Sequence, residues 1–507
     1  MSRINTNISS LIAQRILGQQ NQGLFKSLER LSTGLAINRG ADNPAGLIAS
    51  ERLRSETVAI SAAIGNAERA DQVINIAEGG LQEINALLLE VQALVGESAN
   101  EAGISADEKA ANQLQIDSIL QTIDRIAGAT TFQGTKLLNG TYDYTISGQD
   151  AIISDFSVNA AKLGFGETRA VNLVVTESAQ HGSLFLSAGG GTELNFGGNP
   201  DERFVFEVAG AKGSREFTFA SSTNLSAVAN SINTFKTVTG VSAVASGNYL
   251  ELKSTVHGSD EFVSVEIVDD AGGNQAGAIF QANAKDEDAV DAATASVFNP
   301  AANGIRDDGQ DVGAIINGQT ATSVGKVARI NTDFLDVTLD LTDAGAEALA
   351  ETTAFQITGG GATFQLGPSV NITNQVSLGI ENIATRHLGR TDNEGSVFQL
   401  DDLAQGKGLN VVDGDLTSAQ LVVDKAINQV STLRGRLGAF QKNVIGATIR
   451  SLGVTLENTK AAESSIRDTD FAAETAQLTR SQILVNAATN VLAITNAQPQ
   501  NVLSLLG

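Results

Sequence analysis

Two apolar heptads, one towards each end of the chain, constrain this sequence more than any other feature. Residues 57–100 carry an apolar side chain every seven positions, and the companion positions three residues further on are apolar too. Residues 416–462 repeat the pattern, which weakens at Ser451 and Asn458. This spacing is typical of coiled-coil helices. The seam positions that we expect to be buried are Ile60, Ile74, Leu81, Leu88 and Val95 in the first segment, and Leu437, Phe440 and Val444 in the second.

The length of these segments argues against an ordinary globular core. Roughly 45 helical residues at about 1.5 Å each extend about 65 Å. Two amphipathic helices in a compact bundle are the alternative. Because about 270 residues separate the heptads, the two ends of the chain must come together if the heptads pair. That geometry favours a building block of an assembly over an enzyme.

The middle of the chain follows strand-like patterns instead. Short β-branched or aromatic segments, bounded by Gly, Asn or Asp, are typical of antiparallel strands and hairpins. They include residues 142–146, 171–175, 204–208, 217–219 and 249–252. A chain of 507 residues is long enough for several domains. We therefore predict an α+β multidomain protein, in which the terminal helices pair into a long coiled-coil rod and the central outer region is β-rich.

Charge is unevenly distributed along the chain. Residues 141–414 hold 14 Lys and Arg against 35 Asp and Glu, a net charge of −21, out of −24 for the whole chain. Such a surplus makes nucleic acid an unsuitable partner. No stretch approaches 18 consecutive apolar residues, so we expect no membrane insertion. The first residues lack the apolar core of a cleaved signal peptide, which indicates a soluble chain or export without such a leader.

No pattern of catalytic, cofactor-binding or metal-ligating residues emerges from the sequence. The chain has no Cys, and its three histidines, His181, His257 and His387, are far apart and in no zinc-binding motif. Phosphate-loop and hydrolase-elbow motifs are missing as well. Acidic pairs such as Asp307 and Asp308 lack calcium-loop spacing and are expected to be solvated loops. The sequence therefore predicts a protein that is not an enzyme, with no cofactor and no metal site.

The two extreme ends of the chain form amphipathic helices that have little apolar area of their own. Leu17, Leu24 and Leu31 are one heptad apart near the N-terminus, and we expect Pro499 to end the C-terminal helix. Helices of this kind are expected to be mobile in a monomer and to become ordered on assembly. An apolar C-terminal segment, residues 501–507, needs a cover.

Several motifs at both ends resemble those of bacterial flagellins, in the same order. The N-terminal motifs are residues 3–7, 30–38, 41–51 and 131–138, and the C-terminal motifs are residues 437–441, 461–474 and 501–506. In the middle, residues 217–252, with Ser231, Ile232 and Asn233, resemble the flagellin insertion repeat that is named for its Ile-Asn pair. We place this repeat near residues 217–267.

The resemblance implies a subunit that polymerises with copies of itself into the extracellular bacterial flagellar filament, which serves swimming motility. It implies a core layer from residues 1–40 and 467–507, an inner rod domain from 41–175 and 350–466, and a variable outer domain from 176–349. It also implies secretion by the flagellar type III apparatus, an export chaperone on the C-terminal helix, and contacts with the filament cap and hook-associated proteins. The expected polymerisation core comprises Leu24, Leu28, Leu31, Leu484, Val491, Ile494, Leu503 and Leu506.

One departure from the family pattern concerns the innate immune receptor of vertebrates. Flagellins that activate this receptor strongly carry arginines where this chain has Glu90 and Gln92. A carboxylate in place of a cation predicts weak or absent activation. Among other functions, a hook–filament junction protein shares both terminal regions and is the nearest alternative. A metalloprotease insert lacks its zinc motif here, and an adhesin has no residue-level support.

Overall fold

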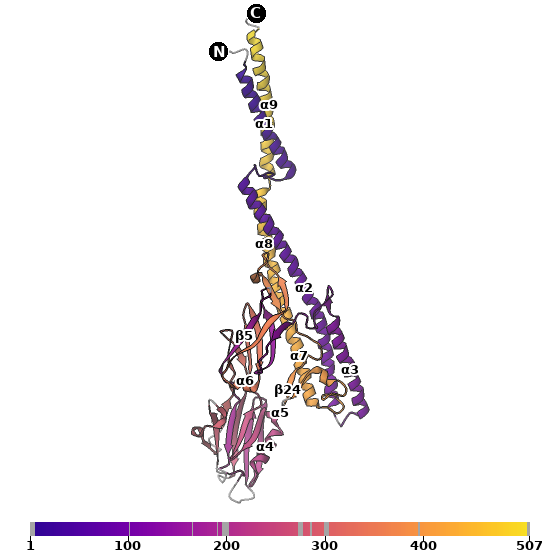
Figure 1. The fold of residues 1–507 in the computed structure, drawn as a ribbon, viewed down its shortest axis with the longest axis vertical. Helices are drawn as coiled ribbons and strands as arrows, with labels where there is room; N and C mark the ends of the chain where they lie inside the picture. The colour runs from indigo at the N-terminus through magenta and orange to yellow at the C-terminus, as the bar shows by residue number, and fades with distance from the viewer. Residues whose placement is uncertain are drawn as a thin grey trace. The chain divides into compact units, whose positions relative to one another are not determined.

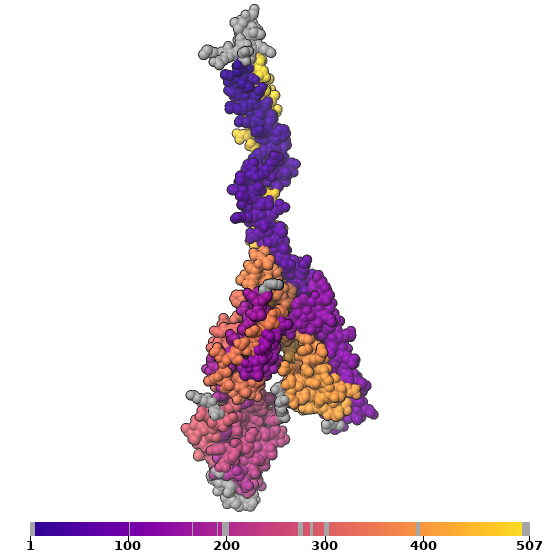
Figure 2. Space-filling view, viewed as in Figure 1, coloured from indigo at the N-terminus to yellow at the C-terminus, as the bar shows by residue number. Residues whose placement is uncertain are grey.

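The computed structural model describes residues 6–100, 102–164, 166–189, 191–194, 202–271, 277–283, 286–298, 304–393 and 396–503 (Figures 1 and 2). The chain divides into two compact units. The first, which we call the helical unit, comprises Met1–Asn75, Phe364–Gln375 and Arg434–Gly507. The second, which we call the β unit, comprises Ile76–Thr363 and Val376–Leu433.

The helical unit brings the two ends of the chain together. Helix α1 (Ile8–Thr33) and helix α9 (Phe471–Leu503) lie side by side, as the indigo and yellow ribbons of Figure 1 show. The Asn7 side chain caps α1 by accepting from the Ser10 amide, and Gly34 ends the helix with a left-handed φ of 74°. The expectation that Pro499 ends the C-terminal helix is wrong, because α9 continues past it to Leu503. Inside a helix, a proline removes one backbone hydrogen bond and its ring crowds the carbonyl four residues earlier, so α9 continues at some cost in stability.

Long helices carry the two heptads. Helix α2 (Pro44–Ser98) has 55 residues, and α7 (Leu416–Ala439) leads through a π-helical turn, Phe440–Ile445, into α8 (Gly446–Arg467). All but one of the predicted seam residues are at most 8 % exposed: Ile60, Ile74, Leu81, Leu88, Val95, Leu437 and Phe440.

Val444 is the exception among the predicted seam residues. It is half-buried, whereas its neighbour Ile445 is fully buried. The π-helical turn adds a residue to one helical turn, which moves the inward-facing position from 444 to 445. A heptad counted through this turn is therefore wrong by one residue.

Two sheets form the first β core of the β unit. One has the order β17-β16-β5-β21-β3 and the other the order β18-β19-β20-β4. One cluster of buried residues from both sheets, with Phe355 among its largest members, fills the space between them. The strands are β3 (Tyr144–Ser147), β4 (Ile153–Ala161), β5 (Arg169–Glu177), β16 (Gly313–Ile316), β17 (Gln319–Thr320), β18 (Thr322–Val324), β19 (Val327–Asn331), β20 (Leu335–Leu341) and β21 (Glu351–Gly360), and α6 (Asp343–Glu347) follows β20.

Two further sheets form the second β core. One has the order β13-β12-β6-β10-β9, with β14 paired to β12, and the other has the order β15-β11-β7-β8. Phe204, Phe206 and Phe217 lie in its buried cluster. Its elements are β6 (Ser183–Ser187), β7 (Arg203–Gly210), β8 (Gly213–Ala220), α4 (Leu225–Asn233), α5 (Lys236–Thr239), β9 (Val241–Ser246), β10 (Tyr249–Ser254), β11 (Phe262–Asp270), β12 (Ala278–Asn283), β13 (Asp286–Val290), β14 (Ser296–Val297) and β15 (Ile305–Asp308).

The Ile-Asn pair of the predicted repeat has a structural role in the second β core. Ile232 is fully buried in the cluster. Asn233 donates from Nδ2 to the Ala243 carbonyl at 2.7 Å and accepts from the Ala243 amide at 2.8 Å. These two hydrogen bonds attach the end of α4 to β9, so the pair fixes a helix on a sheet.

The remaining elements are a helix and short hairpin strands. Helix α3 (Ala106–Ala129) starts with a capping box between Ser105 and Glu108. The short strands are β1 (Thr131–Phe132), β2 (Thr135–Lys136), β22 (Ala362–Gln365), β23 (Gln375–Leu378), β24 (Thr391–Asn393) and β25 (Ser396–Phe398). The predicted α+β organisation, with terminal helices on either side of a β-rich middle, is confirmed. The domain boundaries near 41, 176, 350 and 467 stay predictions.

Candidate functional site: the terminal helix pair

Small side chains make the contact between α1 and α9. Among the side chains that the structure describes, those buried in α1 are Ser10, Ala13 and Ser27, and those buried in α9 are Ser481 and Ala488. A Cβ added at Gly23 would lie 3.8 Å from Ser481 Oγ, so the two backbones approach closely there. Small residues let helices pack closely, but they bury little apolar area, so this contact contributes little hydrophobic stabilisation.

Polar contacts fix the register of the pair at both ends. Near the N-terminus of α1, Asn7 Nδ2 donates to the Thr495 carbonyl at 2.7 Å, and Ser10 Oγ donates to Asn496 Oδ1 at 2.6 Å. At the other end, Arg30 Nη1 lies 3.4 Å from Glu474 Oε2. These contacts align the helices without adding apolar area.

Large apolar side chains on both helices lie at the edges of the contact or outside it. They are 40–68 % exposed, and Figure 2 shows the indigo side chains of α1 at the viewed surface. A run of exposed large apolar side chains is typical of a protein interaction surface. We call this set the apolar terminal surface: Ile8, Leu11, Ile12, Ile16, Phe25, Leu28, Phe471, Ile483, Leu484, Val491 and Ile494.

An apolar groove runs between the two helices. Its volume is about 240 Å³. Its lining residues are Ala13, Ile16, Gln20, Leu484, Ala487, Ala488 and Val491. Because Ile16, Leu484 and Val491 belong to the apolar terminal surface, the groove is a place where an apolar side chain of another molecule fits.

The structure places the predicted polymerisation residues in two groups. Leu28, Leu484, Val491 and Ile494 are exposed. Leu24 and Leu31 are half-buried on the face of α1 that contains Ser27. The side chain of Leu503 and the whole of Leu506 lie outside the described residues.

Part of the apolar terminal surface was missed from the sequence. Ile8, Ile12 and Ile16 recur every four residues on one side of α1. The leucines at seven-residue steps, Leu17, Leu24 and Leu31, form a different row of the same helix. A search at four-residue steps finds the isoleucine row.

The two residues of the predicted receptor position differ in their surroundings. Glu90 is exposed on α2, whereas Gln92 Nε2 donates to Asp424 Oδ1 of α7 at 2.6 Å. Gln92 therefore has a role between the long helices of the β unit. Within the described parts of the chain, every helix is too short or too polar to span a bilayer.

The chain thus combines long helices towards both ends, exposed apolar side chains on the terminal pair and two β cores in the middle of the sequence. Residues 4–143 match the bacterial flagellin N-terminal helical region, residues 421–506 match the bacterial flagellin C-terminal helical region, and residues 203–256 match the flagellin hook IN motif. The last match contains the Ile-Asn pair of α4.

Relatives are similar over nearly the full length. A flagellin of Salmonella rubislaw is 30% identical, a flagellin of Salmonella typhimurium 29% and flagellin B of Helicobacter pylori 28%, each over 99% of both chains. The chain therefore belongs to the bacterial flagellin family. It is a structural subunit of the extracellular flagellar filament, which serves motility.

Proposed function

We propose that the apolar terminal surface of α1 and α9 is where each subunit joins its neighbours in the filament, and that these two helices reach their full stability only there. The observation that carries the proposal is the division of side chains on the pair. Small residues such as Ala13 and Ala488 are buried within the chain, while Leu484, Val491 and Ile494 are exposed.

The energetics of the pair support assembly by coupled folding. Full burial of a Leu, Val, Ile or Phe side chain is worth roughly 1.5–3 kcal/mol before the entropy of ordering is subtracted. Several such residues buried by neighbours supply what the contact between α1 and α9 lacks. Identical subunits that join through different surfaces on each side form an open helix, as a filament requires.

In the proposed filament, the parts of the chain form layers from the inside outwards. Residues 1–40 and 467–507 form the filament core, and 41–175 with 350–466 form the inner rod around it. Residues 176–349 form the outer domain, which contains the whole second β core and strands β16 to β20 of the first. Residues 176–349 hold 9 Lys and Arg against 24 Asp and Glu, and this net charge of −15 keeps the outer domain soluble and makes copies of it repel each other.

The partners follow from the exposed surface of α9. Leu484, Val491 and Ile494 need a cover before assembly, since an exposed apolar helix face promotes aggregation. An export chaperone on the C-terminal helix supplies this cover. The same terminal surfaces contact the filament cap and the hook-associated proteins. The role is structural, with no catalytic site and no nucleic acid or membrane as partner.

Weak or absent activation of the vertebrate innate receptor is a separate part of the proposal. Glu90 is exposed on α2 and offers a carboxylate, and Gln92 is engaged by Asp424. Neither presents the cation that a receptor selecting arginine needs. A reporter-cell assay should show a response at least tenfold below that of an enterobacterial flagellin, and a comparable response would refute this part.

Seeded elongation tests the assembly surface. We would mix purified monomer with short filament seeds and follow pelleting and negative-stain electron microscopy. The triple variant L484N/V491N/I494N should fail to elongate the seeds, because it removes exposed apolar side chains while it leaves the buried Ala13 and Ala488 of the helix contact unchanged.

The matched control is Val244→Asn, which changes an equally exposed apolar residue of β9. It should elongate seeds like the unchanged chain. Circular dichroism should give the same melting of the β cores for both variants. Normal elongation by the triple variant would contradict the proposed surface. A wild-type chain that binds only at seed tips and never elongates would assign it to the hook–filament junction.

A further inference from the structure

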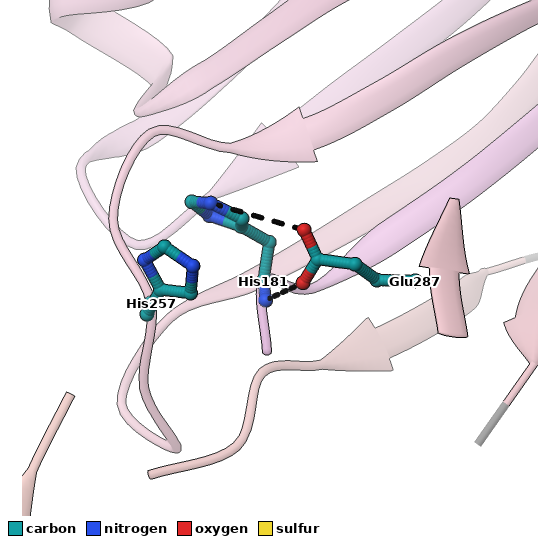
Figure 3. A group of neighbouring side chains, drawn as sticks. All are labelled: His181, His257 and Glu287. Carbon is teal, nitrogen blue, oxygen red and sulfur yellow. Dashed lines mark hydrogen bonds and ion pairs between the residues drawn. The ribbon is translucent and has the colours of Figure 1, made fainter. Parts of the chain in front are cut away.

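Two of the three histidines of the chain lie against each other in the β unit, beside a carboxylate (Figure 3). The ring centroids of His181 and His257 are 3.7 Å apart. One ligand atom from each of His181, His257 and Glu287 lies within 4.8 Å of the other two. A motif search along the chain has no signal for this cluster, because His257 lies 76 positions after His181 and Glu287 another 30 positions further on.

The cluster lies where the chain passes between the two β cores. His181 belongs to the connection between β5 of the first core and β6 of the second. The return connection runs alongside, since Gln180 and Gln310 exchange backbone hydrogen bonds of 2.9 Å in both directions. His257 follows β10, and its Nε2 is 3.4 Å from Glu347 Oε1 at the end of α6 in the first core.

Three features of the side chains suit a cation. His181 Nδ1 is buried and makes no hydrogen bond of normal geometry, although the Val256 carbonyl lies nearby. This arrangement leaves Nε2 facing Glu287 Oε1, at 4.0 Å. Burial lowers the pKa of both imidazoles, which keeps them in the neutral form that binds metals.

Glu287 can serve a metal without leaving a neighbouring cation unpaired. Its Oε2 accepts from the His181 amide at 2.6 Å, which fixes the carboxylate beside the imidazole. Lys253 Nζ lies 3.3 Å from Glu287 Oε1, but it also contacts Glu251 Oε1 at 3.0 Å and the Asp288 carboxylate. Lys253 therefore keeps two partners if Glu287 turns towards a metal.

We propose that His181, His257 and Glu287 form a binding site for a divalent transition metal, with Zn²⁺ as the best fit, that fastens the connection between the two β cores. Two imidazoles and a carboxylate are a donor set that suits Zn²⁺. Neighbouring ligand atoms around a tetrahedral Zn²⁺ are about 3.3 Å apart, so the side chains must close by about 1.5 Å. Glu347 is placed to supply a fourth oxygen, which would join the first core to the second.

Metal titration of the full-length monomer tests the site. The chain would be stripped with chelator, dialysed and titrated with ZnCl₂ in a calorimeter, with bound metal measured by mass spectrometry. We expect one Zn²⁺ per chain. The variants His181→Ala and His257→Ala should each weaken binding at least tenfold, and His387→Ala, which removes the exposed third histidine, should not change it.

A second readout needs no variant. With ¹⁵N-labelled histidine, Zn²⁺ should shift the imidazole signals of two of the three histidines and leave the third unchanged. The proposal is overturned if the folded wild-type chain takes up no stoichiometric Zn²⁺, or if uptake is unaffected by His181→Ala and His257→Ala. If the buried His257 variant fails to fold, Glu287→Gln and the histidine signals decide the question.

Discussion

The terminal helix pair and the two β cores use apolar residues in opposite ways. In the β cores, the largest side chains, such as Phe204, Phe206 and Phe355, are fully buried within the chain. In the terminal pair, small residues are buried and large ones such as Phe25 and Ile494 are exposed. Apolar residues in the cores specify the fold of one subunit, and in the proposed assembly those on the terminal pair specify how subunits join.

The largest expected effect comes from deleting the pair. A chain without residues 1–40 and 467–507 should form no filaments under any seeding condition, because it lacks the apolar terminal surface. Its β cores should melt as in the full chain, since no residue of either buried cluster is removed. Pelleting and differential scanning calorimetry measure the two effects. If this truncated chain formed filaments, the terminal pair would not be the region that joins subunits.

The next largest effect is a difference in the stability of the monomer between a substitution in a β core and one in the terminal pair. Phe204→Ala should destabilise the second β core by about 3–5 kcal/mol, since the site is fully buried. Leu484→Ala removes a side chain that is 40 % exposed and should lower the free energy of unfolding of the monomer by no more than about 1 kcal/mol. Urea unfolding of both variants provides the comparison. A large loss of monomer stability from Leu484→Ala would mean that the pair is already a folded core in the free subunit.

A smaller effect is expected at the contact between α1 and α9. Ser481 is buried opposite Gly23, so Ser481→Leu should overpack the pair at a cost of about 1–3 kcal/mol. The cost should appear as filaments that dissociate at a lower temperature. Thr479→Leu adds similar bulk at an exposed position of α9 and is the control. Equal dissociation temperatures for the two variants would show that close approach of the helices is not needed.

The smallest effect concerns the connector between α1 and α2. The Lys26 ammonium, 2.8 Å away, and the backbone amides of Arg39 and Asn38 lower the pKa of Asp42 to about 2. A carboxyl group whose pKa is depressed stabilises the folded state above its ordinary pKa, and this contribution is lost as the pH falls towards 2. Because the Lys26 side chain that pairs with Asp42 is 47 % exposed, solvent screens the contact and the loss should be slight.

Filament dissociation measured against pH tests this. Asp42→Asn should lower stability a little at neutral pH and reduce the loss between about pH 4 and pH 2. A nuclear magnetic resonance titration that finds an ordinary pKa for Asp42 would contradict the assigned contacts.

Local repetition made much of this fold predictable from the sequence. The heptads, the capping box at Ser105 and the Ile-Asn pair depend on neighbours within a few residues, which periodicity reveals. The π-helical turn was not predictable in this way, because one extra residue leaves the composition unchanged while moving the buried position from Val444 to Ile445.

The pairing of strands that are far apart along the chain could not be predicted from the sequence. In the first β core, β5 lies between β16 and β21, which follow it by more than 130 residues. The contact of His181 with His257 depends on the same kind of arrangement, so a motif search along the chain has no signal for it. The exposed row Ile8, Ile12 and Ile16 could be predicted from the sequence, but only by counting apolar residues every four positions in place of every seven.

Hydrogen exchange of monomer and filament, followed peptide by peptide, tests the central claim most directly. We expect the amides of α1 and α9 to exchange quickly in the monomer and to become strongly protected in the filament. The amides of β5, β7 and β20 should be protected in both states, because their side chains are already buried. Strong protection of α1 and α9 in the free monomer, unchanged on assembly, would contradict the account.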